Sequence, residues 1–200
     1  IVWRSFFWYT CRVMSCVIFT GGGTGGHIFP GIAVAEVLKK ETGIPIIWIG
    51  SNNGTDRSYV CSADIPFYGI PAGKLRRYFS LENLIDVFKI IGGFFASLII
   101  LLRLKPRFVF SKGGFVSVPP CVAARCLKIP VITHECDFSP GLATKINMRF
   151  ADQVLISYAK TAEFSGYRAE EACRYRKPCT NAFLCSRCGI WQSFYSIYRW

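Results

Sequence analysis

The pattern of apolar and polar positions is regular between Met14 and about Phe164. Short runs of Val, Ile and Phe alternate with longer segments whose apolar residues recur every three or four positions. The short runs predict buried strands, and the longer segments predict helices packed against them. We expect strands at residues 16–20, 45–49, 65–70, 107–111, 130–134 and 153–157, and helices at 32–40, 80–102, 118–127 and 140–150.

This alternation predicts an α/β fold in which a Rossmann-like, doubly wound parallel sheet is covered by helices. In such a sheet, ligands bind in the crevice beyond the carboxyl ends of the strands. Residues that directly follow a strand are therefore the first candidates for binding and chemistry.

The two ends of the chain lack this regularity. Residues 1–13 precede the first Met, so we interpret them as an upstream extension and Met14 as the natural start. Residues 165–200 are rich in Cys, Arg and aromatic residues without a sustained period, which favours a frameshifted or disordered tail. Cys185 and Cys188 form a CxxC pair, which is one half of a typical four-ligand zinc site. No second pair with matching spacing accompanies it, so we predict no metal.

The composition is typical of a folded domain with an anionic partner. The 200 residues are 52% hydrophobic and 18% charged, which excludes disordered and fibrous proteins. The formal net charge of +12 favours an anionic partner: lipid headgroups, a phosphorylated substrate or nucleic acid. The aromatic and basic pattern of a nucleic-acid binder is confined to residues 165–200, so we expect no nucleic acid.

The predicted helix at residues 80–102 is unusually apolar. Its uninterrupted apolar part, residues 90–102, is shorter than the roughly 20 residues that a spanning helix needs. Basic residues flank this helix: Lys74, Arg76, Arg77, Lys89, Arg103, Lys105 and Arg107. Two interpretations stay open: a crossover helix buried against the sheet, or a helix that lies on an anionic membrane surface.

The first candidate site is the segment TGGGTGGH, residues 20–27, between the first predicted strand and helix. Glycines let the backbone approach a ligand closely, and the N–H groups at a helix start bind anions. The spacing also fits a dinucleotide-binding loop, but the second strand ends in Gly50, Ser51 and Asn52, without an acid for the ribose. His27 is either a base or substrate ligand, or a residue that packs the helix start.

The second candidate site is FSKGGFVSVP, residues 110–119, where a strand again meets a glycine pair before a helix. Gly113 and Gly114 predict a second anion cradle at the same edge of the sheet. Two neighbouring cradles suit a diphosphate better than a single phosphate. The alternative is a tight turn that needs glycine only for its geometry.

The third candidate site is HECDFSPG, residues 134–141, which follows another predicted strand. Glu135 and Asp137 would be delivered into the cleft, where a carboxylate binds sugar hydroxyls or accepts a proton from an attacking hydroxyl. The alternative is a helix-capping Asp137, with Glu135 paired to Lys145 or another cation.

Taken in this order, the three motifs resemble one family, the MurG glycosyltransferases. The resemblance covers roughly residues 14–164 and is carried by GGGTGGHIFPGIAVAEVL, FSKGGFVSVPPCVAA and HECDFSPGLATKIN. It implies the N-terminal, acceptor-binding domain of a GT-B glycosyltransferase. The family transfers N-acetylglucosamine from UDP-GlcNAc to undecaprenyl-pyrophosphoryl-MurNAc-pentapeptide (lipid I), forming lipid II for peptidoglycan. It works as a peripheral enzyme on the cytoplasmic face of the bacterial inner membrane, without a cofactor.

The resemblance also assigns substrate-binding positions. Thr24, Gly25, Gly26, Gly113, Gly114, Phe115 and Asp137 match family positions that contact the two substrates. The residues of the first loop face the donor, and those of the second loop help to hold the acceptor diphosphate. Many members have Asn where Asp137 stands, and Asp lacks the amide donor and adds a charge.

The implied mechanism is inverting, with direct attack by the acceptor hydroxyl on the anomeric carbon. A base must take the hydroxyl proton, and His27 and Glu135 are the two candidates, between which the sequence does not decide. His134 and Glu135 match the start of the family's third motif. The leaving UDP needs hydrogen bonds and helix dipoles rather than an obligatory metal.

The resemblance ends near Phe164, before the family's donor-binding C-terminal domain. We therefore expect that this chain alone has little or no transferase activity, because one wall of the cleft cannot align both reactants. Two other functions stay open. One is an NAD(P)-binding Rossmann protein, and the other is a non-enzymatic, basic, peripheral membrane-binding domain.

Overall fold

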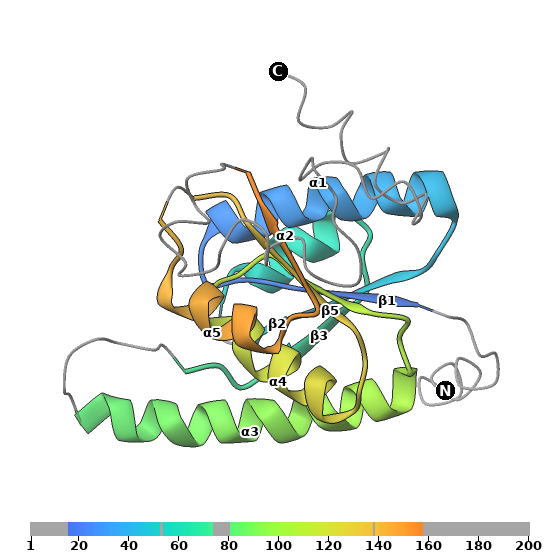
Figure 1. Cartoon of the computed structure of the whole chain (residues 1–200). Coiled ribbons are helices and arrows are strands. Elements are labelled where there is room, and N and C mark those ends of the chain that lie inside the picture. The colour runs from blue at the N-terminus through green and yellow to red at the C-terminus, as the bar shows by residue number, and fades with distance from the viewer. Residues whose placement is uncertain (1–15, 53, 74–80, 138, 158–200) are drawn as a thin grey trace.

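Six parallel strands form one central sheet in the computed structural model, in the order β3-β2-β1-β4-β5-β6 (Figure 1). The strands are β1 (Val17–Thr20), β2 (Ile46–Ser51), β3 (Phe67–Ile70), β4 (Val109–Ser111), β5 (Val131–Glu135) and β6 (Gln153–Ile156). The order reverses between β1 and β4, as in Rossmann folds, and ligand sites lie at this switch point. The predicted α/β doubly wound sheet is confirmed, and each strand begins and ends within two residues of its prediction.

The structure describes residues 16–52, 54–73, 81–137 and 139–157. The predicted extension at 1–13 and tail at 165–200 lie outside these residues. So do Cys185, Cys188 and the three basic residues at positions 74, 76 and 77.

Helices cover both faces of the sheet (Figure 1). They are α1 (Gly25–Thr42), α2 (Asp56–Ser62), α3 (Leu81–Leu104), α4 (Val118–Cys126) and α5 (Leu142–Phe150), with a short 3-10 turn, η2 (Phe115–Ser117). Figure 1 shows α1 and α2 on one face, and α3, α4 and α5 on the other. The ends of the β-strands nearest the glycine loops therefore lie between two helical layers.

The structure differs from the predicted helices in two places. Helix α1 begins at Gly25, seven positions before the expected start, although Gly25, Gly26 and Pro30 disfavour a helix. Burial overrides this propensity, because Ile28 is fully buried and Gly31 packs against the ring of Trp48. Helix α2 was not predicted, since only its first residue and Val60 are buried and no apolar period develops.

Two apolar cores hold the layers together. Phe19, Trp48 and Phe110 lie with the buried side chains of α1, while Ile18, Val109 and others lie with α3 and α4. The rings of Phe19 and Phe110 are 4.8 Å apart between centroids. The indole Nε1 of Trp48 donates a 3.1 Å hydrogen bond to the carbonyl of Gly21. The first core therefore ties the first glycine loop to the centre of the sheet.

Helix α3 packs mainly on α4 and lies along the outside of the fold (Figure 1). A Cβ atom on Gly93 would overlap the Pro71 carbonyl, so this glycine allows close approach on the inner side. The outer side is exposed at Val87, Phe88, Ile91, Phe95, Ile99 and Leu102. Residues 86–104 are long and apolar enough to cross a membrane, with a mean hydropathy of 2.1, and only 17% of them are buried.

Candidate functional site

The two glycine loops lie side by side at the edge of the sheet. Strands β1 and β4 are neighbours, with Thr20 opposite Ser111, and the Lys112 N–H donates a 2.8 Å hydrogen bond to the Thr20 carbonyl. A Cβ atom on Gly114 would overlap the carbonyl oxygen of Gly22. The shared edge that the spacing predicts is therefore confirmed, and the loops touch through their backbones.

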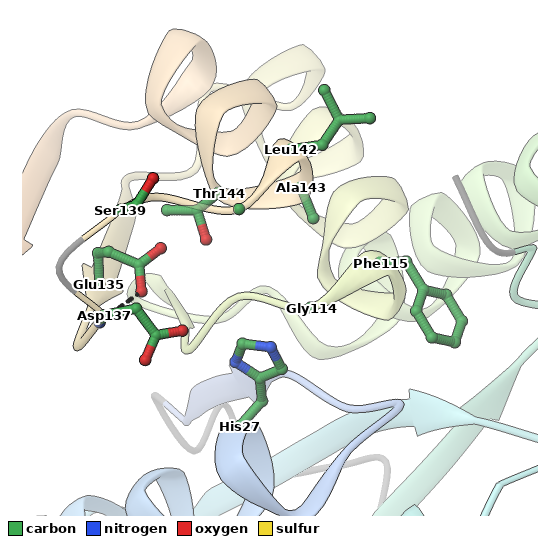
Figure 2. Close-up of a pocket in the computed structure, with 10 residues that line it drawn as sticks. His27, Gly114, Phe115, Glu135, Asp137, Ser139, Leu142, Ala143 and Thr144 are labelled. Atoms are coloured by element: carbon green, nitrogen blue, oxygen red, sulfur yellow. Dashed lines mark hydrogen bonds between the residues drawn. The ribbon is translucent and has the colours of Figure 1, made fainter. Parts of the chain in front are cut away.

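One cavity of about 310 Å³ opens at this edge. All three motifs contribute to its lining, which Figure 2 draws: His27, Gly114, Phe115, Glu135, Asp137, Ser139, Gly141, Leu142, Ala143 and Thr144. The strand order causes this convergence, because β1, β4 and β5 are consecutive in the sheet and each ends in one motif. The third motif delivers Glu135 and Asp137 into the cleft, as expected.

His27 is the third residue of α1, and its ring projects into the cavity (Figure 2). Its Nδ1 atom is buried and has no hydrogen-bond partner among the described residues. The ring lies against the second glycine loop, 3.1 Å from the position of a Cβ atom on Gly114 and 3.6 Å from one on Gly113. A side chain at Gly114 would therefore press on the ring, whereas one at Gly113 would be in ordinary contact with it.

Glu135 ends β5 and is only 2% exposed. One of its carboxylate oxygens, Oε1, accepts a 2.9 Å hydrogen bond from the Asp137 N–H. The alternative roles considered for this pair do not fit, because Gly141 is the N-cap of α5 and the described residues include no ion pair with Glu135. Glu135 thus shapes the loop that carries Asp137 toward the cavity.

Four expected binding residues do not line the cavity. Thr24, Gly25 and Gly26 form the start of α1 next to it, and Thr24 makes no side-chain cap bond. Gly113 is a buried residue of the second loop, and a Cβ atom there would lie 2.9 Å from the Thr144 hydroxyl. Their contacts with substrate stay predictions.

His134 lies in the sheet rather than in the cavity. Burial and then the positive charge of Lys112 lower its pKa to about 3, so the imidazole is neutral at physiological pH. One ring nitrogen, Nε2, lies 3.2 Å from the Ser157 hydroxyl. The residue is thus part of the packing beside β6, not a candidate for proton transfer.

Sequence reasoning missed Asn147, which lies beneath the second glycine loop. Its amide donates to the hydroxyl oxygens of Ser111 (3.1 Å) and Ser117 (2.7 Å). Ser111 accepts the Gly113 N–H at 3.2 Å, and Ser117 donates to the Gly114 carbonyl at 2.7 Å. Asn147 therefore connects α5 to both glycines. Its only signal in the sequence is a polar residue on the apolar face of a predicted helix.

Sequence reasoning also missed Asp56, the first residue of α2. Its two carboxylate oxygens accept hydrogen bonds from the Gly23 N–H (3.2 Å) and the Ser51 N–H (3.1 Å). The acid that seemed absent after β2 is thus present a few residues later. It binds protein backbone and is buried, so it is not available to a ribose.

The fold and the cavity define a Rossmann-like domain with a cavity at the carboxyl edge of the sheet, beside two glycine loops. The model of the glycosyltransferase family 28 N-terminal domain matches residues 17–156. The chain therefore belongs to this glycosyltransferase family.

Relatives with a stated activity are similar over the same part of the chain. A Treponema denticola protein is 65% identical over 158 residues, which cover 75% of this chain and 40% of that protein. It is a UDP-N-acetylglucosamine--N-acetylmuramyl-(pentapeptide) pyrophosphoryl-undecaprenol N-acetylglucosamine transferase. A Treponema pallidum protein (strain Nichols) of the same name is 59% identical over 147 residues, covering 74% of this chain and 38% of its own length. The chain thus spans about two fifths of these relatives.

Solved structures agree with this assignment. The crystal structure of Acinetobacter baumannii MurG superposes with a TM-score of 0.63 at 31% identity, covering 74% of this chain and 42% of MurG. The UDP-GlcNAc 2-epimerase of Neisseria meningitidis, bound to UDP-GlcNAc, gives a TM-score of 0.58 at 13% identity, covering 78% of this chain and 44% of the epimerase. The second likeness concerns the fold alone.

Proposed function

We propose that residues 14–164 form the acceptor-binding half of a transferase that moves N-acetylglucosamine from UDP-GlcNAc to lipid I, yielding lipid II. The observation that carries this proposal is that all three motifs line the same cavity. The activity named for the Treponema relatives supports the choice of substrates. The NAD(P)-binding alternative loses its support, since the acid after β2 is buried against the Gly23 N–H.

The acceptor diphosphate would bind at the second glycine loop. Gly113 and Gly114 have φ angles of 88° and 80°, which let the backbone turn sharply beside the ligand. Gly114 has no side chain of its own to separate the loop backbone from the cavity. Thr24, Gly25 and Gly26, at the start of α1, would meet the donor, where helix N–H groups favour phosphate oxygens.

In the reaction, the acceptor's 4-hydroxyl oxygen attacks the anomeric carbon of the donor sugar. The new C–O bond forms as the bond to UDP breaks, and the hydroxyl proton passes to a base. We propose His27 as this base, because its ring projects into the cavity and lies against the second glycine loop. Glu135 is the weaker candidate, since its Oε1 already accepts the Asp137 N–H.

A chimeric enzyme tests this function. Residues 14–157 would be joined to the part of the Treponema denticola transferase that follows the matching segment, and transfer of labelled N-acetylglucosamine to a lipid I analogue would be measured. We expect turnover by the chimera and little or none by the 200-residue chain alone. A folded chimera without transfer, beside an active Treponema denticola enzyme, would contradict the proposal.

Two variants of the chimera separate the candidate bases. We expect His27→Asn to lower kcat by about 10²-fold or more, as loss of a general base does. Glu135→Gln keeps a side-chain oxygen for the Asp137 N–H and should act mainly on KM. The reverse ranking of the two kcat effects would make Glu135 the base.

A second observation supports a peripheral membrane location, on the cytoplasmic face of the bacterial inner membrane. The outer side of α3 exposes large apolar side chains from Val87 to Leu102, and Lys89, Arg103, Lys105 and Arg107 lie along or just beyond the helix. Apolar side chains in the acyl boundary and basic ones at anionic headgroups suit a helix lying in the interface. The inner side of α3 packs on α4, which favours this position over a spanning one. An enzyme docked in this way would meet its lipid-linked acceptor at the bilayer surface.

A further inference from the structure

The carboxylate of Asp56 is almost completely enclosed, with 1% of the residue exposed. It is bordered by glycines on three sides. A Cβ atom would overlap the carboxylate if added to Gly22, would lie 3.1 Å from Oδ1 if added to Gly54, and 3.4 Å from the Asp56 Cβ if added to Gly50. The chain therefore has room for this carboxylate because Gly22 has no side chain, and the fit at Gly54 is also tight.

The charge of Asp56 is balanced by backbone donors rather than by a cation. Its oxygens accept the N–H groups of Gly23 and Ser51, and the described residues include no ion pair with it. A buried carboxylate is costly unless such hydrogen bonds compensate it. The two bonds therefore connect the first glycine loop to the end of β2.

The Gly23 backbone that Asp56 binds lies at the contact between the two glycine loops. Gly23 has a φ angle of 87°, and a Cβ atom there would overlap the ring of Phe115 from the second loop. The neighbouring Gly22 carbonyl lies against Gly114. A carboxylate that fixes the Gly22–Gly23 backbone therefore also fixes the surface on which Gly114 and Phe115 pack.

We propose that Asp56 is a positioning residue that organises both glycine loops for a diphosphate ligand. This inference rests on the proposed function, because it takes the loops to be the diphosphate site. Asp56 itself does not contact the ligand, since it is buried behind Gly22 and Gly23. Its role is to hold the first loop so that the cavity keeps its shape.

Removing the charge of Asp56 distinguishes a positioning role from a purely electrostatic one, because the two roles predict opposite changes in diphosphate binding. Asp56→Asn removes a negative charge close to the anion site, and on electrostatic grounds alone it should strengthen binding of a diphosphate. The amide can accept only one of the two backbone N–H groups and directs its own donors at the other. Positioning by Asp56 therefore predicts weaker binding, by about tenfold or more.

The matched control is Asp64→Asn, which removes the same charge just beyond α2. Asp64 is fully exposed, at 3.6 Å from the Lys39 ammonium, and Asn tolerates its φ angle of 53°. Binding of a short-chain polyprenyl diphosphate, with the monophosphate for comparison, would be measured by calorimetry well below the unfolding midpoint of each variant. We expect wild type and the control to bind the diphosphate alike.

Several outcomes would overturn the inference. If wild type binds the diphosphate and Asp56→Asn binds it equally well or more tightly, Asp56 has no positioning role. If wild type binds no diphosphate, the proposed function fails and this inference falls with it. Amide hydrogen exchange of wild type gives a test that needs no variant. We expect the Gly23 N–H to exchange at least tenfold more slowly than that of Gly25, and equal rates would contradict the Asp56 bond.

Discussion

The ring of Phe115 lies on the backbone of Gly23, so that the two glycine loops are in direct contact; a methyl group at position 23 would come within 2.9 Å of the ring Cδ1 and overlap its edge. The contact joins residues from β1 and β4 loops that are far apart in the chain but neighbours at the sheet edge. Packing of one loop on the other therefore contributes to the stability of the site.

Gly23→Ala should destabilise the protein and weaken diphosphate binding. The substitution places a side chain at a φ angle of 87° and forces Phe115 to move. We expect a loss of about 3 kcal/mol in the free energy of unfolding, combining backbone strain with overpacking. Urea unfolding at neutral pH measures this loss.

Gly43→Ala is the matched control for backbone strain. Gly43 has a φ angle of 65° at the end of α1, and no atom lies within 4 Å of an added Cβ. It should cost only about 1 kcal/mol, from strain alone. Equal losses for the two variants would mean that Phe115 does not restrain Gly23.

Asn147→Ala should loosen the second glycine loop. The amide donates to Ser111 and Ser117, and its removal leaves two buried hydroxyl oxygens short of a donor. We expect a loss of about 2 kcal/mol in the free energy of unfolding and faster amide exchange at Gly113. Arg149→Ala, an exposed position on the same helix, should change neither quantity. Unchanged exchange at Gly113 would remove the proposed link between α5 and the loop.

The sheet could be predicted because its strands are continuous apolar runs that end in glycine-rich or polar motifs. Parallel topology then made the convergence of the three motifs a consequence of strand order. The start of α1 could not be predicted, because local propensity at Gly25, Gly26 and Pro30 opposes the burial that decides it. Tertiary packing was stronger than the local preference.

The side chains behind the cavity were also beyond prediction. Asp56 acts through backbone N–H groups of Gly23 and Ser51, and nothing in the spacing of these residues indicates a contact. Asn147 similarly donates hydrogen bonds to hydroxyl oxygens of residues that are distant along the chain. Conversely, His134 looked like a site residue because it stands in a motif, whereas alternation along β5 turns it away from the cavity that Glu135 reaches.

The buried His134 should make stability depend on pH. Its pKa is lowered to about 3, against roughly 6.5 in an unfolded chain, so below pH 6.5 the unfolded state binds a proton that the folded state does not. The stability from this residue is fully present above pH 6.5 and falls as the pH is lowered toward 3. Between pH 7 and pH 5 we expect a loss of roughly 2 kcal/mol from this group.

His134→Gln should reduce the fall in stability between pH 7 and pH 5, measured by urea unfolding at both values.

Lys112→Met tests the second cause of the lowered pKa of His134, which is the charge of the lysine. Its ammonium is buried and has no hydrogen-bond partner among the described residues, so its removal should raise both the pKa of His134 and the stability at pH 7. A pH dependence that both variants leave intact would mean that other groups are responsible.

Replacing apolar residues on the outer side of α3 should weaken membrane binding. Phe88 and Phe95 are 66% and 56% exposed, so their removal should cost little stability. We expect the double variant Phe88→Ser and Phe95→Ser to bind vesicles of phosphatidylcholine and phosphatidylglycerol about tenfold more weakly, because two apolar anchors are lost. Vesicle co-sedimentation measures the bound fraction.

The control for this prediction is Phe29→Ser, since Phe29 is 54% exposed on α1, on the other face of the sheet. It should bind vesicles like wild type. That result would show that binding depends on an aromatic residue being on α3, and not only on its being exposed. Because the adjacent charges at Arg103, Lys105 and Arg107 attract anionic headgroups, high salt should release the bound protein. Retention of the protein on vesicles in high salt would instead favour insertion of residues 86–104. An equal loss of binding in the α3 double variant and in Phe29→Ser would exclude α3 as the specific contact.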